Sequence, residues 1–190
     1  MTTIACASVT APAKAQLHAK PISANTAYEL RGFAIEAPAG DGWFELRSDE
    51  SNAYFGKKLR SPTHSFIAVA TSATLTEAFV SPGELLEHVT RMQSQDQTAR
   101  GSIVESHAEL DTAPRRFCVR HYTRAQDREA VHAMGKPLEM ETFGLSCLHP
   151  DYLRLLVDVS YTERGLPGEA SPELKAEGEG VIRSLAFRPF

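Results

Sequence analysis

Residues 140–161 read METFGLSCLHPDYLRLLVDVSY, and this stretch decides the fold class. Two runs rich in β-branched, aromatic and leucine residues, Met140–Leu148 and Leu153–Tyr161, flank the turn-forming segment His149-Pro150-Asp151. In the second run every other residue is large and apolar, which is typical of a strand with one buried face: Leu153, Leu155, Val157, Val159 and Tyr161. The stretch therefore predicts an antiparallel hairpin.

The sequence on the N-terminal side of this hairpin predicts more strands. Ile103–Leu110 and Arg116–Thr123 lie on either side of a turn at 111–114, and together they predict a second hairpin. Residues 124–138, which are rich in charge and contain Gly135 and Pro137, are predicted to form a long connection between the two hairpins. Further short strands are expected from Tyr28 onward, of which Ser65–Ala70 has the strongest strand composition.

A helix is predicted over residues 82–96. It is preceded by Ser81-Pro82-Gly83-Glu84, in which a serine N-cap, a proline at the first helical position and a glutamate at the third form a capping box. Apolar residues then recur at helical spacing, and we expect this stripe to pack on the sheet: Leu85, Leu86, Val89 and Met92.

A second helix is predicted after Ser171-Pro172, again with serine as the cap. Its apolar face is expected to consist of Leu174, Val181, Ile182 and Leu185. Gly178 and Gly180 each weaken such a helix by about 1 kcal/mol relative to alanine, unless they allow close packing on the sheet.

These elements predict an α+β domain built on an antiparallel β-sheet of six or more strands flanked by helices. The chain has 190 residues, of which 42% are hydrophobic and 23% are charged, and these values are ordinary for one globular domain. Residues 1–26 show no apolar period and are rich in Ala, Thr and Pro, so we expect a flexible N-terminal tether followed by a single domain over 27–190.

An extended "F-x-I-x-x-P" pattern closes on "G-W" after a turn, and the layout resembles a known family at these positions: Phe33, Ile35, Pro38, Gly42 and Trp43. The resemblance is to the PsbP-like and DcrB-like domains, which share their fold with the Mog-type Ran-binding proteins. It covers roughly residues 28–188 and implies an α/β/α sandwich and a non-enzymatic domain, often exported or lipid-anchored in bacteria. It implies no catalytic residue.

The N-terminus offers a candidate lipidation site. Thr3-Ile4-Ala5-Cys6 resembles a bacterial lipobox, and the small-residue run after Cys6 resembles the tether that follows a lipidated cysteine. The basic and apolar regions of a signal peptide are not seen ahead of Cys6. The alternative is an ordinary tail with a chance cysteine.

The other two cysteines are a candidate disulfide. If Cys6 were lipidated, an even pair, Cys118 and Cys147, would remain to oxidise in a periplasm. Strand alternation places Cys118 with Arg120 and Tyr122, a polar face, which conflicts with the apolar face of Cys147 unless both faces of the sheet are covered. Two buried, reduced cysteines are the alternative.

No catalytic motif and no cofactor motif is found: the sequence has no G-x-S-x-G, Walker loop, H-E-x-x-H or paired C-x-x-C. Two pairs with i, i+2 spacing, Glu105 with His107 and Cys147 with His149, are too few for a zinc site, which needs three or four converging ligands. Cys118 and His121 are three residues apart and are expected on opposite faces of a strand. We therefore expect that the protein is not an enzyme and that it binds neither a metal ion nor a cofactor.

The charge pattern excludes nucleic acid as the expected partner. The net charge is −4, and the arginines of residues 115–124 form no concentrated positive face. The expected function is a non-enzymatic binding or interaction module of the bacterial cell envelope, with a protein partner or a small apolar ligand. The membrane would be reached only through a lipid anchor. A cytoplasmic adaptor or chaperone-like protein of the same fold is the alternative.

Overall fold

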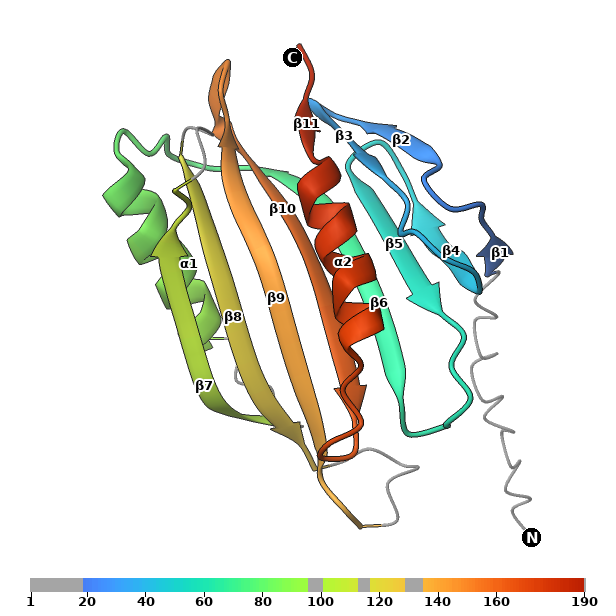
Figure 1. Cartoon of the computed structure of the whole chain (residues 1–190). Coiled ribbons are helices and arrows are strands. Elements are labelled where there is room, and N and C mark those ends of the chain that lie inside the picture. Colours follow the sequence, from blue (N-terminus) through green and yellow to red (C-terminus); the bar gives the residue numbers. More distant parts are fainter. Residues whose placement is uncertain (1–18, 96–100, 113–116, 129–134, 190) are drawn as a thin grey trace, which may run out of the picture.

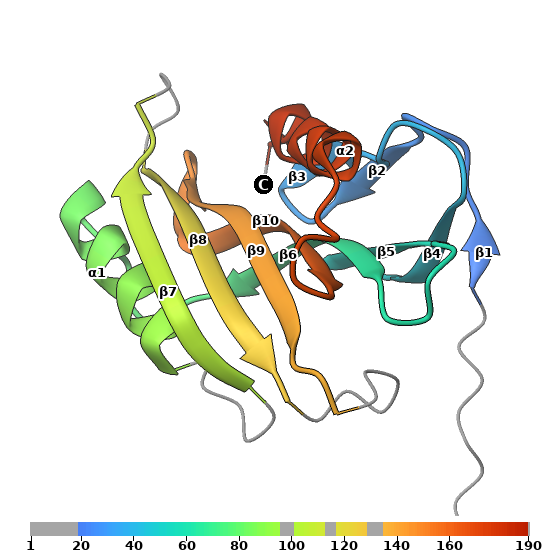
Figure 2. The ribbon, with the colours of Figure 1, turned by 60° about the horizontal axis from the view of Figure 1, so that its bottom comes forward.

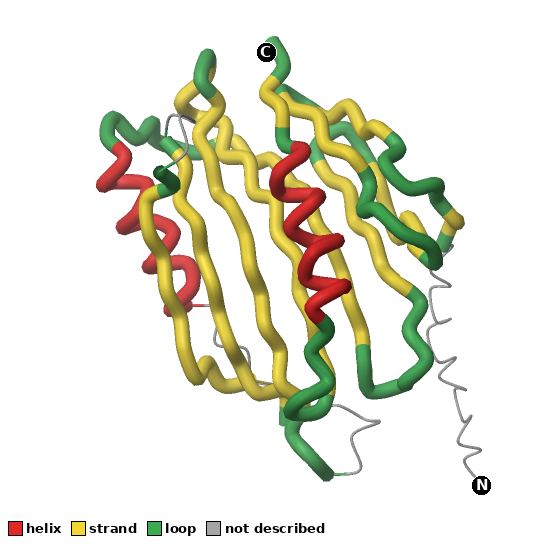
Figure 3. Tube along the Cα trace, viewed as in Figure 1, coloured by secondary structure: helices red, strands yellow, loops and turns green. Residues whose placement is uncertain are grey.

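The computed structural model describes residues 19–95, 101–112, 117–128 and 135–189. Strands dominate it, with two helices (Figure 3). Eight strands form one antiparallel sheet in the order β1-β4-β5-β6-β10-β9-β8-β7 (Figure 1). Their bounds are β1 Lys20–Pro21, β4 Trp43–Ser48, β5 Asn52–Lys57, β6 Ser65–Thr74, β7 Gly101–Leu110, β8 Cys118–Asp127, β9 Leu138–His149 and β10 Tyr152–Gly165.

A second, three-stranded antiparallel sheet has the order β11-β3-β2, with β2 at Ala27–Leu30, β3 at Phe33–Glu36 and β11 at Ala186–Phe187. Helix α1 spans Pro82–Gln95 and helix α2 spans Pro172–Ser184. The prediction of an α+β domain with an antiparallel sheet of six or more strands is confirmed at this level.

The two predicted hairpins are β7–β8 and β9–β10, and β8 pairs with β9 to join them. Both strands of the join are longer than predicted, because β8 continues to Asp127 and β9 begins at Leu138. The predicted connection over 124–138 was therefore wrong at both ends. Its first residues belong to β8 and its last residue belongs to β9, because a charged residue can extend a strand when the residues on the opposite face are covered. Residues 129–134 of that connection lie outside the described part of the chain.

A β-bulge in β10 places Leu153 on the side of the sheet opposite to the one predicted. The register of β10 against β9 shifts between Tyr152 and Leu156. Beyond the bulge the predicted alternation is confirmed, since Leu155, Val157, Val159 and Tyr161 are buried in the main core. Leu153 was placed on the same face, but it packs into the separate cluster around α1, because the bulge reverses the alternation.

Helix α2 contacts the middle of the large sheet at β10 and β6, and it also contacts β3 of the small sheet (Figure 1). Gly178 permits this approach, because a Cβ there would lie 2.4 Å from Cγ of Tyr161. A Cβ at Gly180 would meet nothing within 4 Å. Of the two glycines expected to weaken this helix, close packing on the sheet therefore explains Gly178 and does not explain Gly180.

An aromatic series runs across the strands on the α2 side of the large sheet. Phe66 stacks on Tyr161 and Tyr161 on Phe143, with ring centroids 5.6 and 5.2 Å apart, and Trp43 and Tyr122 contact the two ends. The Trp43 indole nitrogen donates a hydrogen bond to Glu177 of α2 at 2.7 Å. Trp43 therefore anchors α2 and is part of the core.

Helix α1 lies on the other side of the sheet, over β7 and β8 (Figure 2). Leu85 and Val89 are buried as predicted, and Leu86 is half-buried. Met92 was also predicted to pack on the sheet, but it is 55% exposed, and Gln93 is buried in its place. The buried stripe follows residues four apart on the helix, Leu85, Val89 and Gln93, so Met92 lies beside the stripe. Gln93 is accommodated because its amide donates to the Tyr122 carbonyl and to Thr123 Oγ1.

The domain begins before the predicted boundary at Ala27. Lys20 and Pro21 pair with β4, and the backbone amide of Ile22 donates to the carbonyl of Trp43. Ile22 also packs against the main core, so this part of the predicted tether over 1–26 belongs to the sheet. The rest, residues 1–18 with the candidate lipidation site Cys6, lies outside the described residues, as do Asp96 at the predicted end of the first helix and Phe190.

Candidate functional site

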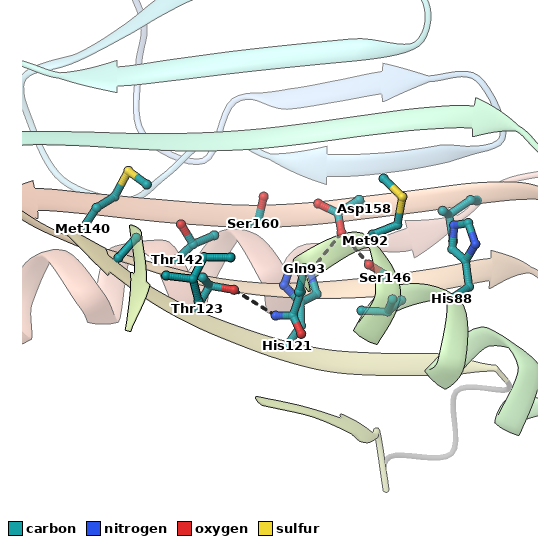
Figure 4. Close-up of a pocket in the computed structure, with 14 residues that line it drawn as sticks. His88, Met92, Gln93, His121, Thr123, Met140, Thr142, Ser146, Asp158 and Ser160 are labelled. Carbon is teal, nitrogen blue, oxygen red and sulfur yellow. Dashed lines mark hydrogen bonds and ion pairs between the residues drawn. The ribbon is translucent and has the colours of Figure 1, made fainter. Parts of the chain in front are cut away.

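An open pocket of about 520 Å³ lies between α1 and the sheet (Figure 4). Its lining comes from α1, from β7 and from the three strands β8, β9 and β10. The lining residues are His88, Val89, Met92, Gln93, Ile103, His121, Thr123, Ala125, Met140, Thr142, Ser146, Leu156, Asp158 and Ser160. This volume lies within the range typical of small-molecule sites.

The pocket exists because α1 covers only one end of this side of the sheet. It packs on β7 and β8, while β9 and β10 continue beyond it. Apart from Met140 and Leu156, the uncovered side of these two strands carries small or polar residues, including Thr142, Ser146 and Ser160, so few bulky side chains fill the space. A bulge between Ile103 and Glu105 in β7 turns Ile103 toward the pocket.

A hydrogen-bonded cluster centred on Asp158 lies in the wall formed by the sheet. His121 Nε2 donates to Asp158 Oδ2 at 3.0 Å, and the Ser146 hydroxyl donates to the same oxygen at 2.6 Å (Figure 4). Burial raises the pKa of the Asp158 carboxyl, but the hydrogen bond and charge of His121, with Ser146 and Ser160, outweigh burial and hold it below its usual value. Asp158 is therefore ionised at neutral pH.

His121 reaches Asp158 because residue 144, between them on β9, is glycine. In the register of the sheet His121 lies opposite Gly144, and Gly144 lies opposite Ser160. A Cβ at Gly144 would lie 2.2 Å from Cε1 of His121, so any side chain would occupy the space of the imidazole. Gly144 thus sets the position of the histidine.

The wall formed by α1 includes two apolar side chains, Val89 and the exposed Met92. Met140 contributes a second thioether from β9, on the opposite wall. His88 packs against Phe79, with ring centroids 5.0 Å apart, and its pKa is lowered by burial and by the nearby charge of Arg91. His88 is accordingly uncharged at neutral pH.

This arrangement is suited to binding rather than to acyl transfer. A nucleophilic serine needs its hydroxyl to donate to a base, normally an imidazole nitrogen. Here the Ser146 hydroxyl and the His121 imidazole both donate to one oxygen of Asp158. The cluster therefore offers an ionised carboxylate with ordered hydrogen bonds, in a pocket whose walls are partly apolar.

The candidate disulfide residues come together on the opposite side of the sheet. Cys118 and Cys147 are direct partners in the β8–β9 register, with Cα atoms 4.1 Å apart, and their sulfur atoms are bonded at 2.07 Å. The conflict over faces is resolved because this side is covered and Tyr122 packs its ring on Phe143. Cys118 and His121 lie on opposite faces, as predicted.

The candidate metal pairs are each engaged elsewhere. Glu105 pairs with Arg124, and His107 with Glu109 at 3.4 Å. His149 is fully buried, with Nε2 donating to the carbonyl of Arg188 and Nδ1 accepting from the amide of Asp151. Within the described residues no three or more His, Cys, Asp or Glu side chains converge as metal ligands.

The cluster around Asp158 was not predicted from the sequence. A signal was present, because Asp158 is a carboxylate between Val157 and Val159 in the most apolar strand of the chain. A charge at such a position is costly unless it is paired, so it marks a face that meets a partner or a pocket. His121 and Ser146 gave no comparable signal, because only the register of β8, β9 and β10 brings them to Asp158.

Comparisons with known proteins add no assignment. No protein-family model matches the chain, and no curated protein matches it significantly. Neither helix of the described residues combines the length and the apolar character that crossing a membrane requires.

Proposed function

We propose that this protein is a non-enzymatic binding module of the bacterial cell envelope, and that its binding site is the pocket between α1 and the sheet. The observation that carries the proposal is the pocket itself: about 520 Å³, open, with apolar walls and a small set of ordered polar groups. Small-molecule sites in general have this composition. A small ligand with a large apolar part is the occupant that such walls favour.

The finer fold assignment is part of the proposal. We take the domain to be an α/β/α sandwich of the PsbP-like and DcrB-like type, with α2 on one side of the large sheet and α1 on the other. The positions that carry the resemblance support it structurally, because Phe33, Ile35 and Trp43 are all buried and Gly42 has a positive φ of 81°. They are core and turn positions, so they support a shared fold without implying a shared ligand.

The envelope location rests on the two cysteines. A disulfide between Cys118 and Cys147 is expected in an oxidising compartment and is rare in the cytosol. Lipidation of Cys6 would anchor the domain to a membrane through the segment before β1. A cytoplasmic adaptor of the same fold remains the alternative, and it requires both thiols to be reduced.

The binding proposal is tested with N-phenyl-1-naphthylamine, an uncharged apolar probe whose fluorescence rises in apolar sites. We expect the folded protein to bind it saturably. Met92→Glu should weaken binding about tenfold, because the new carboxylate would lose hydration beside the bound probe. Met92 is exposed, so the variant should fold normally.

Thr90→Glu is the matched control, because it places the same charge at an exposed position two residues away on α1, outside the pocket lining. It should leave the affinity within about twofold. Equal weakening by both variants, or no saturable binding to the unaltered protein, would overturn the assignment of the pocket.

A further inference from the structure

We propose that the pocket selects a lipophilic amine, a molecule with an apolar body and one protonated nitrogen that pairs with Asp158. This inference rests on the proposed function, because it takes the same pocket as the binding site. It adds the chemical class of the ligand, which follows from the charges and hydrogen bonds of the lining.

The apolar body is accommodated by side chains from five elements. Val89 and Met92 line it from α1, Ala125, Met140 and Leu156 line it from β8, β9 and β10, and Ile103 lines it from β7. Figure 4 shows Met140 at one end of the labelled residues and Met92 with His88 at the other, with Asp158 between them. The two methionines can adjust to ligands of different shape, because the thioether side chain is flexible and polarizable.

The nitrogen is accommodated by Asp158, which the pocket can reach because its side chain is 29% exposed. An ionised carboxylate offers about four acceptor positions. His121 and Ser146 donate to Oδ2, and a further interaction comes from the Ser160 hydroxyl. One acceptor position therefore remains for an ammonium group, which would gain a charge-assisted hydrogen bond.

The charges of the lining disfavour an anion. None of the described residues that line the pocket is a lysine or an arginine. His88 is held uncharged, and Arg91, which contacts it at 3.2 Å, is exposed on α1 and does not line the pocket. His121 is already paired with Asp158. A carboxylate or phosphate group would thus face a carboxylate with no unpaired cation in the lining, which costs binding energy.

The test compares three molecules with the same ten-carbon chain: decylamine, decanol and decanoate. Each displaces N-phenyl-1-naphthylamine from the protein at pH 7.5, below the concentration at which the chains aggregate. We expect decylamine to displace the probe at a concentration about tenfold or more below that of decanoate, with decanol between them. Equal potency of decylamine and decanoate overturns the inference and leaves the binding proposal intact.

Asp158→Asn tests the group that is named. The amide keeps the shape of the side chain and removes the charge, so the preference for decylamine over decanoate should fall to within about twofold, while decanol changes little. Asp41→Asn, at an exposed position in the turn before β4, removes the same charge far from the pocket and should leave the preference unchanged. A preference that survives in Asp158→Asn contradicts the inference.

The two proposals fail in different ways. If the probe does not bind the unaltered protein saturably, the pocket is not a ligand site and both proposals are overturned. If the probe binds and Met92→Glu weakens it, but the three ligands show no dependence on charge, only the ligand class is overturned. The comparison of ligands uses the unaltered protein, so it stands even if Asp158→Asn does not fold.

Discussion

At the scale of single residues, Asp158 occupies a demanding position. It carries a negative charge, while the residues on either side of it in β10, Val157 and Val159, are completely buried on the other face of the sheet. Its charge is maintained by His121 and Ser146, and His121 is in turn admitted by the missing side chain of Gly144. Residues of three neighbouring strands, β8, β9 and β10, thus depend on one another for one ionised group.

This dependence predicts how acid affects stability. The pKa of Asp158 in the folded protein lies below its unfolded value, which is about 4. Its ionised form therefore stabilises the fold above about pH 4, and this contribution is lost as the pH falls through the folded value. Urea unfolding at pH 6 and at pH 3 should show that the stability gap between the unaltered protein and Asp158→Asn shrinks in acid.

Asp41→Asn serves as the control for general acid effects, because that residue is exposed. If the difference in unfolding free energy between the unaltered protein and Asp158→Asn stays constant from pH 6 to pH 3, the charge of Asp158 contributes nothing to folding.

At the scale of elements, α1 both attaches to the sheet and lines the pocket, and its apolar stripe does not show in the sequence which residue does which. Leu85 and Val89 hold it to the sheet, where they pack with Val119 of β8 and Leu148 of β9. One further turn along the helix, Gln93 is bound to the backbone of β8 while Met92 is left exposed beside the pocket. The apolar stripe is therefore partly an attachment to the sheet and partly the edge of a cavity.

Substitutions on α1 should separate these two functions. Leu85→Ala leaves a cavity at a fully buried position and should lower the free energy of unfolding by about 2–5 kcal/mol. Met92→Ala, at a side chain that is mostly in contact with solvent, should change it by less than about 0.5 kcal/mol. Thermal or urea unfolding monitored by circular dichroism measures both. A large loss for Met92→Ala would mean that this end of α1 also packs tightly on the sheet.

At the scale of the whole molecule, the disulfide links the fold to a compartment. Cys118 begins β8 and Cys147 lies near the end of β9, so their bond joins residues 29 positions apart and closes a loop that includes most of both strands. Constraining such a loop in the unfolded chain is worth about 3–4 kcal/mol in the chain-entropy model.

Reduction with dithiothreitol should therefore lower the free energy of unfolding by up to about 3–4 kcal/mol, and the double variant Cys118→Ser, Cys147→Ser should be insensitive to it. Mass spectrometry of the protein from its native host checks the compartment. An exported lipoprotein should show a diacylglycerol adduct on Cys6 and the loss of two hydrogen atoms from the other two cysteines. Three free thiols on an unprocessed chain would contradict export.

The sequence by itself determined the fold class and the main elements. Strand alternation in 140–161, the turn at 111–114 and the serine-proline caps at 81 and 171 are local signals, and each acts within a few residues, so the hairpins and helices could be predicted. Only the tertiary structure decided which of these surfaces meet. The bulges that reverse Leu153 and turn Ile103 and the meeting of His121 with Asp158 depend on register between strands. The exposure of Met92 depends on which face of α1 meets the sheet. Register and helix placement are both set by long-range packing.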